Sequence, residues 1–368
     1  MQCEICEHSL ERVWSIEKSV IPNRYYNLPN QTEFFEQETF FCTCCDYALN
    51  KHLIPEHKMY EDYVYRSPNT SEDVEAVSII TRLIDEEDIK TVSEVGGNNG
   101  VFAKKILDKA LNIDEYLIWD KVKSSKTHPK LHFKNEFLTK STEPTEVDLV
   151  IVRHAFAHNA SISKFADNII EKFNPDFIYI ECADWFETLV NRDFSQLYSE
   201  HFYCLSGKAI AKLFHKENYA KLTEIKLGIH NGSFGLLLSR KVENKKFITE
   251  AKSYDVSREI KAWVTDVNDF WYKLKTSDLN IWACSAKFIF TINALELKNI
   301  EKIKIVIDST EDKHNKFPPG LFCPVSPELK TIKDENLNFI IGARNFASQV
   351  ENKIRTLSTN YSAIIPPF

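Results

Sequence analysis

Two pairs of cysteines near the N-terminus have the spacing of a metal site. Cys3 and Cys6 form one Cys-x2-Cys pair, and Cys42 and Cys45 form a second. Such pairs can place four thiolates tetrahedrally around Zn2+, with each sulfur at about 2.3 Å. A site closed by four thiolates leaves no position for a substrate, so the metal is predicted to be structural. Cys44 offers a competing ligand, and the alternative interpretation is a group of five free thiols.

A glycine-rich turn is the second chemical feature. The segment TVSEVGGNNGVFAKKIL leads from an apolar strand into a helix, and its glycines let a ligand approach the backbone closely. Asp120 ends the next strand, where an acidic residue binds ribose hydroxyls in doubly wound folds. The turn has neither the Gly-x-Gly-x-x-Gly pattern of pyrophosphate sites nor a P-loop, and it suits S-adenosylmethionine (SAM). The alternative is a structural turn with a solvated Asp120. The predicted SAM-binding residues are Glu94, Gly96, Gly97, Asn98, Gly100 and Asp120.

The elements around this turn alternate between strand and helix. An amphipathic helix is expected over residues 71–89, and strand and helix candidates then alternate from residue 90 to 182, which predicts a parallel sheet covered by helices. A helix over 256–276 precedes a second strand-rich alternation. The predicted fold class is therefore α/β in three parts. These are a zinc-binding domain at 1–75, a Rossmann-like SAM-binding domain at 76–245 and a C-terminal α/β domain at 246–368.

Composition narrows the possible partners. The 368 residues carry a net charge of -7, and 43% are hydrophobic, as in ordinary globular proteins. No block of lysine and arginine is visible, so nucleic acid is not expected as a partner. The first residues do not have a signal-peptide pattern, and no apolar run approaches the roughly 20 residues of a membrane helix. We expect a cytoplasmic protein without a membrane partner, and the oligomeric state stays open, with a monomer as one option.

With both features in place, the chain resembles the zinc-containing, SAM-dependent sugar C-methyltransferases, which methylate a carbon of a nucleotide-linked deoxy-keto-sugar. The two cysteine pairs match that family's zinc module, and the glycine turn is similar to its Glu-x-Gly-x-Asn-x-Gly. The segment YVYRSPNTS matches a stretch that faces the sugar in relatives, which assigns Tyr63, Tyr65 and Ser67 to substrate binding. The resemblance implies a class I methyltransferase domain in the middle of the chain.

The same resemblance implies the catalytic residues. VRHAFAH places His158 at the family's histidine, and DFSQLYSEHFYCLS aligns Tyr198, Glu200 and His201, with Ser199 in place of a histidine. Methylation of carbon needs a base that removes a proton beside a ketone, and histidine can do this near neutral pH. We expect His201 to be that base, Glu200 to orient it, and Tyr198 or His158 to donate to the enolate.

The C-terminal part resembles the family with several departures. It is expected to bind the nucleotide-linked sugar, but Ala283, Asn315 and Arg344 replace two glycines and a tryptophan, and Asn231 in the central part replaces a glycine. The remaining predicted substrate-binding residues are Asn231, Lys287, Lys313 and Asn345. Two alternatives stay open: an O- or N-methyltransferase on a related molecule, and a non-catalytic scaffold that binds SAM or a nucleotide-sugar. The sequence leaves open which sugar, nucleotide, carbon and pathway are involved.

Overall fold

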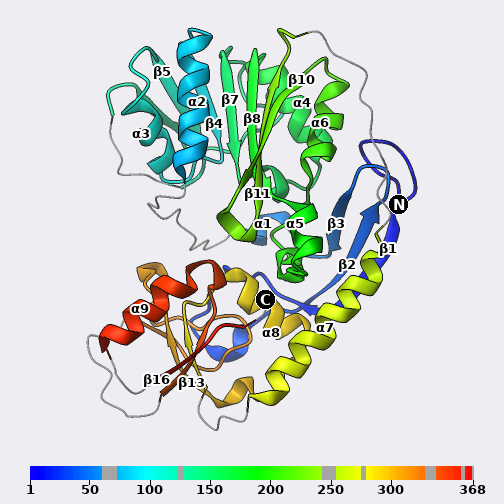
Figure 1. Cartoon of the computed structure of the whole chain (residues 1–368), viewed down its shortest axis with the longest axis vertical. Helices are drawn as coiled ribbons and strands as arrows, with labels where there is room; N and C mark the ends of the chain where they lie inside the picture. The colour runs from blue at the N-terminus through cyan, green and yellow to red at the C-terminus, as the bar shows by residue number, and fades with distance from the viewer. Residues whose placement is uncertain are drawn as a thin grey trace.

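A computed structural model describes residues 1–59, 73–122, 128–242, 254–274, 279–327, 337–357 and 361–366. The described residues form three sheets. In Figure 1 the central sheet and its helices lie at the top, the C-terminal sheet lies at the bottom, and the N-terminal strands run along one side between them. Among these residues, no helix has both the length and the apolar character needed to cross a membrane.

The N-terminal sheet is antiparallel and takes its last strand from the middle of the chain. Its order is β1-β2-β3-β9. The bounds are Glu11–Ser19 for β1, Phe35–Cys42 for β2, Tyr47–His52 for β3 and Tyr203–Cys204 for β9. Short helix α1 (Glu56–Met59) follows β3. Because Leu49 pairs with Tyr203 and Ala48 with Cys204, this sheet is complete only when the central part of the chain has folded.

The central sheet has the order β10-β11-β8-β7-β4-β5-β6. The strands are β4 (Thr91–Val95), β5 (Glu115–Trp119), β6 (Leu131–Lys134), β7 (Leu149–Arg153), β8 (Phe177–Ala183), β10 (Ala220–Leu227) and β11 (Ser233–Ser239). Neighbours from β6 to β8 are parallel, whereas β11 is antiparallel to both β8 and β10. This mixed sheet is consistent with a Rossmann-like methyltransferase fold. The order reverses between β4 and β7, which creates a switch point where such sheets bind ligands.

Helices cover both faces of the central sheet because alternate strand residues point to opposite faces. On one face, α2 (Val74–Glu86) and α3 (Val101–Leu107) pack on residues such as Val92 and Ile118. On the other, α4 (Ile162–Phe173) and α6 (Gly207–His215) pack on residues such as Val150. Helix α5 (Trp185–Val190) follows β8. The amphipathic helix expected over 71–89 is present as α2, which ends earlier, at Glu86, and residues 71 and 72 lie outside the described part.

The C-terminal sheet is parallel and has the order β14-β13-β12-β15-β16. Its strands are β12 (Leu279–Trp282), β13 (Ile303–Ile307), β14 (Val325–Ser326), β15 (Leu337–Ile341) and β16 (Tyr361–Ile364), accompanied by α8 (Ala286–Ala294) and α9 (Ala347–Leu357). A second switch point lies between β12 and β15. Helix α7 (Val256–Lys273) runs beside the N-terminal strands, as Figure 1 shows, and packs against β1.

The hydrophobic cores join the three sheets. Cys3, Cys42 and Cys45 belong to the same buried cluster as the α4 and α6 face of the central sheet. A second cluster combines β1 residues such as Val13 with Trp263 of α7 and other residues of the C-terminal part. The proposed boundaries at 75/76 and 245/246 stay predictions, since the nearby residues 60–72 and 243–253 lie outside the described part.

Candidate functional site

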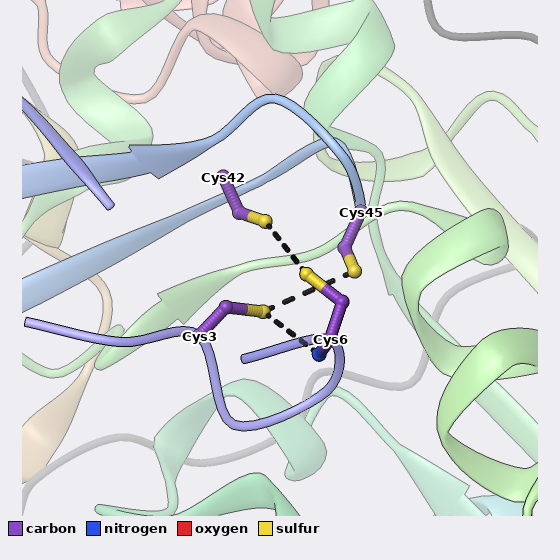
Figure 2. A group of neighbouring side chains, drawn as sticks. All are labelled: Cys3, Cys6, Cys42 and Cys45. Atoms are coloured by element: carbon purple, nitrogen blue, oxygen red, sulfur yellow. Dashed lines mark hydrogen bonds between the residues drawn. The ribbon is translucent and has the colours of Figure 1, made fainter. Parts of the chain in front are cut away.

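The four predicted metal-ligating cysteines lie together. Figure 2 shows the Cys3–Cys6 turn facing the Cys42–Cys45 turn. The Sγ atoms of Cys3 and Cys45 are 3.9 Å apart, and those of Cys6 and Cys42 are 3.6 Å apart. A tetrahedron with metal–sulfur bonds of about 2.3 Å has sulfur–sulfur edges of roughly 3.8 Å, so the cluster fits a metal ion.

The backbone around these cysteines supports the same fit. Glu7 and Asp46, each directly after the second cysteine of a pair, both have left-handed φ angles, of 64° and 55°. The N–H groups of Ile5 and Cys6 each donate to the Cys3 sulfur at 3.4 Å, which favours a thiolate there. Cys44 is outside this group of four: its sulfur accepts from Lys212 Nζ at 3.2 Å and lies near Cys6 and His8.

A cavity of about 1780 Å3 lies between the two switch points. Its central-sheet wall includes the glycine turn after β4 and the segment after β7. Its C-terminal wall includes the segments that follow β12, β13 and β15. Parallel sheets bind ligands at the carboxyl ends of their strands, on either side of a switch point, so two ligands can meet in this one space.

The glycine turn is built for close approach. Gly96 has φ of 78°, and a Cβ there would lie 2.4 Å from the Cβ of Ala155. Asn98 has φ of 49°, in the left-handed region that asparagine tolerates. Gly100, with φ of 75°, is the N-cap residue directly before α3. The turn and the segment after β7 therefore pack tightly beside the cavity.

The two predicted acidic residues lie at this turn. Asp120 lines the cavity, and its carboxylate accepts from the N–H groups of Asn98 and Val122, each at 2.8 Å. Glu94 is 2% exposed and accepts from the Tyr116 hydroxyl at 2.9 Å. Burial raises the pKa of Glu94 to about 7, outweighing the opposing effects of Arg153 and Tyr116.

His201 and Tyr198 form a hydrogen-bonded pair that lines the cavity. Tyr198 Oη and His201 Nε2 are 2.8 Å apart, and His201 Nδ1 is 2.9 Å from the carbonyl oxygen of Gln196. A carbonyl can only accept, so Nδ1 carries the proton and Nε2 holds the lone pair. The neutral ring of His201 therefore offers a base on the side of Tyr198.

His158 completes this group. Its ring lies edge-on to the ring of His201, with centroids 4.9 Å apart. Burial, with a smaller contribution from the charge of His154, lowers the pKa of His158 to about 4. Its imidazole is therefore neutral near pH 7.

The N-terminal module, which comprises the cysteine turns, strands β1 to β3 and the residues between them, holds the segment that carries His201. Asn50 Nδ2 donates to the carbonyl oxygens of His201 and Leu197, at 2.8 and 3.1 Å. The carboxylate of Glu200 is fully buried and accepts from Asn23 N and Nδ2, at 3.0 and 2.8 Å. Glu200 thus anchors the segment to Asn23, and the carbonyl of Gln196 orients His201, a role that we expected of Glu200.

The predicted substrate-binding residues have different positions. Lys287, Lys313 and Asn345 line the cavity. Lys287 Nζ pairs with Asp193 at 2.8 Å, and Asn231 donates to the same carboxylate at 3.1 Å. Lys313 Nζ pairs with Asp308 at 2.9 Å. Tyr63, Tyr65 and Ser67 lie outside the described residues.

Sequence reasoning missed a polar group under the glycine turn. His154 Nε2 is 2.7 Å from Glu181 Oε1, and Arg153 binds Glu181 through two hydrogen bonds of 2.9 Å and Asp73 through one of 2.7 Å. Three of these residues stand at the carboxyl ends of β7 and β8. The charged residues at the ends of two buried strands are the signal that could have identified this group.

No protein-family model and no curated protein matches this sequence. Among solved structures, part of the chain is similar to the N-methyltransferase NodS from Bradyrhizobium japonicum WM9, at 11% identity and a TM-score of 0.35, over 47% of this chain and 97% of that one. The plantazolicin methyltransferase BpumL, solved with SAH, is similar at 10% identity and a TM-score of 0.36, over 48% and 85% of the two chains. The mitomycin 7-O-methyltransferase MmcR is similar at 11% identity and a TM-score of 0.35, over 45% and 54%.

Proposed function

We propose that this chain is a SAM-dependent methyltransferase that methylates a carbon of a nucleotide-linked keto-deoxysugar. One observation carries the proposal: His201, whose Nε2 is hydrogen-bonded to Tyr198 Oη, lines a cavity that joins two ligand-binding switch points. Methylation of an oxygen or nitrogen would not need a base for a C–H proton.

The central switch point supports the assignment of the methyl donor. SAM, when bound, supplies an electrophilic methyl group. The glycine turn would hold its amino-acid end, and Asp120, which lines the cavity at this turn, would accept from its ribose. Gly96 leaves no room for a side chain at this contact.

The opposite wall supports a nucleotide-linked acceptor. Helix α8 begins at the carboxyl end of β12 with Ser285 as its cap, so its N-terminal dipole favours negative charge. Arg344 lines the same wall, and Lys287 and Lys313 line it as the partners of Asp193 and Asp308. The helix N-terminus and Arg344 would hold a diphosphate, which would direct the sugar toward His201.

The residues around His201 suit enolate formation. The Tyr198 hydroxyl must turn away from Nε2 before a substrate proton can bind there, and it can then donate to the developing enolate oxygen. Neutral His158 supplies a second donor without adding a charge. The pair would thereby couple proton removal to stabilisation of the enolate.

The zinc ion is proposed to be structural. The four cysteines would hold it beside the core of the central sheet, away from the cavity lining, and no catalytic step is assigned to it. Through β3 and Asn50 the same module anchors the segment that carries His201.

The test uses a panel of dTDP- and GDP-linked 4-keto-6-deoxyhexoses, with SAM, and mass spectrometry of the products. We expect one added methyl group on carbon, and exchange of the α-hydrogen in D2O without SAM. His201→Asn should slow both by roughly 100-fold or more. The exposed His132→Asn is the matched control.

Each alternative has its own outcome. A product methylated on oxygen or nitrogen, at an unchanged rate in His201→Asn, would favour an O- or N-methyltransferase. Binding of SAM without turnover of any panel member would favour a scaffold.

A further inference from the structure

The pair of His154 and Glu181 has no role in the chemistry proposed so far. The two residues end neighbouring strands, and Glu181 Oε1 lies 2.7 Å from His154 Nε2. A carboxylate accepts, so Nε2 carries the ring proton and the lone pair of the neutral ring is on Nδ1. A carboxylate placed in this way orients a histidine and stabilises its protonated form.

Glu181 is held as a carboxylate. It is fully buried, and it accepts from Arg153, His154 and Tyr179. Burial alone would raise the pKa of Glu181, but the charge of Arg153 and the hydrogen bond from His154 hold it well below its usual range. A negative charge therefore lies directly behind the His154 ring.

The backbone of His154 is strained. Its φ is 50°, in the left-handed region that residues other than glycine rarely adopt. Such strain costs on the order of 1 kcal/mol or more and is concentrated at functional sites. Here it accompanies a side chain that lines the cavity, directly before the residue that packs on Gly96.

Carbon methylation creates a need for such a group. When the methyl group of a sulfonium replaces a hydrogen on carbon, the C–H and S–CH3 bonds break, a C–CH3 bond forms, and one proton is left over. His201 holds that proton on Nε2 and must lose it before the next turnover. Behind His201 lies the neutral carbonyl of Gln196, whereas behind His154 lies a carboxylate.

The two histidines line one cavity. His158 packs edge-on to His201. All three rings line the same cavity. His154 is also partly open to solvent, with its side chain 28% exposed.

We propose that His154, oriented by Glu181, accepts the displaced substrate proton from His201 and releases it to solvent. The N–H bond at His201 Nε2 breaks as one forms at His154 Nδ1, by way of water in the cavity that both rings line. The imidazolium lies against Glu181 until its proton passes to bulk water. This inference rests on the proposed function.

The test combines two substitutions that the left-handed backbone accepts. His154→Gly removes the ring and leaves space for imidazole, and His154→Asn fills the space without a group that transfers protons. The probe is whichever panel sugar the wild type methylates. We expect the steady-state rate to fall roughly 100-fold in both variants, since general acid–base groups contribute at least this much. Added imidazole should restore His154→Gly in proportion to its concentration, and it should not restore His154→Asn.

Two controls decide between outcomes. Both variants should keep the wild-type affinity for SAH, and His132→Asn should keep the wild-type rate. A wild-type rate in His154→Gly, a loss that imidazole does not restore, or a loss of SAH affinity would each overturn the inference. If the wild type methylates no panel sugar, the proposed function fails instead, and the inference fails with it.

Discussion

Glu94 gives the most direct test of how burial controls charge beneath the glycine turn. Glu94→Gln keeps the size of the side chain, and its amide oxygen can still accept from Tyr116. The wild-type carboxyl has a pKa of about 7 in the folded protein and 4.5 as its ordinary value. At about 1.4 kcal/mol per pKa unit, this interval corresponds to roughly 3 kcal/mol.

The sign follows from the protons bound in each state. Between pH 4.5 and about 7 the folded protein holds the proton on Glu94 and the unfolded chain has lost it. The contribution of Glu94 to the free energy of unfolding therefore falls as pH rises through this window and is constant above it. Glutamine does not titrate, so the variant should become more stable than the wild type, by roughly 3 kcal/mol at pH 8 and little at pH 4.5.

The assay is urea unfolding of both proteins at pH 5, 6, 7 and 8, with equal m-values as the condition for comparison. The exposed Glu136→Gln controls for the substitution itself. A stability difference that stays constant from pH 5 to 8, or that favours the wild type at pH 8, would refute the reasoning. Weaker SAH binding by the stabilised variant would support a role of Glu94 in the cofactor site.

Further predictions concern the turn, the metal and the anchored segment. Gly96→Ala should weaken SAH binding by roughly tenfold or more, because the new Cβ would lie 2.4 Å from the Cβ of Ala155. Titration calorimetry measures the SAH affinity, and the control Gly228→Ala should keep the wild-type affinity, since no atom lies within 4 Å of a Cβ there. Cys42→Ser should lose bound zinc by mass spectrometry and destabilise the protein by several kcal/mol in urea unfolding. Asn50→Ala removes two hydrogen bonds to the His201 segment and should lower the free energy of unfolding by about 1–3 kcal/mol. Because this segment carries His201, kcat should fall by a larger factor than KM rises in steady-state kinetics. In the wild type, His158 should make the free energy of unfolding rise from pH 4 to 6.5, because over this range the unfolded chain binds a proton that the buried ring does not. His158→Gln should remove this rise, which urea unfolding at these pH values measures.

Local patterns in the sequence were sufficient to predict the parallel strands of the central sheet. The mainly apolar runs at 115–119 and 149–153 are buried parallel strands, and residues 91–95 form a third such strand that was recognisable from the glycine turn after it. The β3–β9 pairing was not predictable in the same way. Strand β9 has two residues, and its pairing depends on contacts between distant parts of the chain.

The functional site likewise contains residues that local sequence patterns identify and residues whose roles depend on distant contacts. The positions of Cys3 in the cysteine group and of Asp120 beside the glycine turn were predictable, because they follow from the spacing of these residues along the chain. His154 and Asn50 were missed, because the role of each depends on a partner that is remote in sequence. Glu181 follows on the next parallel strand, and the carbonyl that Asn50 holds is 151 residues away.

The contact between the cysteine turns and the central sheet has a consequence for synthesis on the ribosome. Glu4, inside the first cysteine pair, accepts a hydrogen bond from Tyr203, 199 residues later in the chain. The two cysteine turns are therefore translated long before the strand and core that cover them. Two segments that are this far apart in the sequence come together only after a large loop has closed, which slows folding and keeps apolar surface exposed for longer. Early metal capture by the two turns would keep the nascent N-terminal segment folded during that interval, so zinc supply during translation should affect the yield of active protein more than zinc added afterwards.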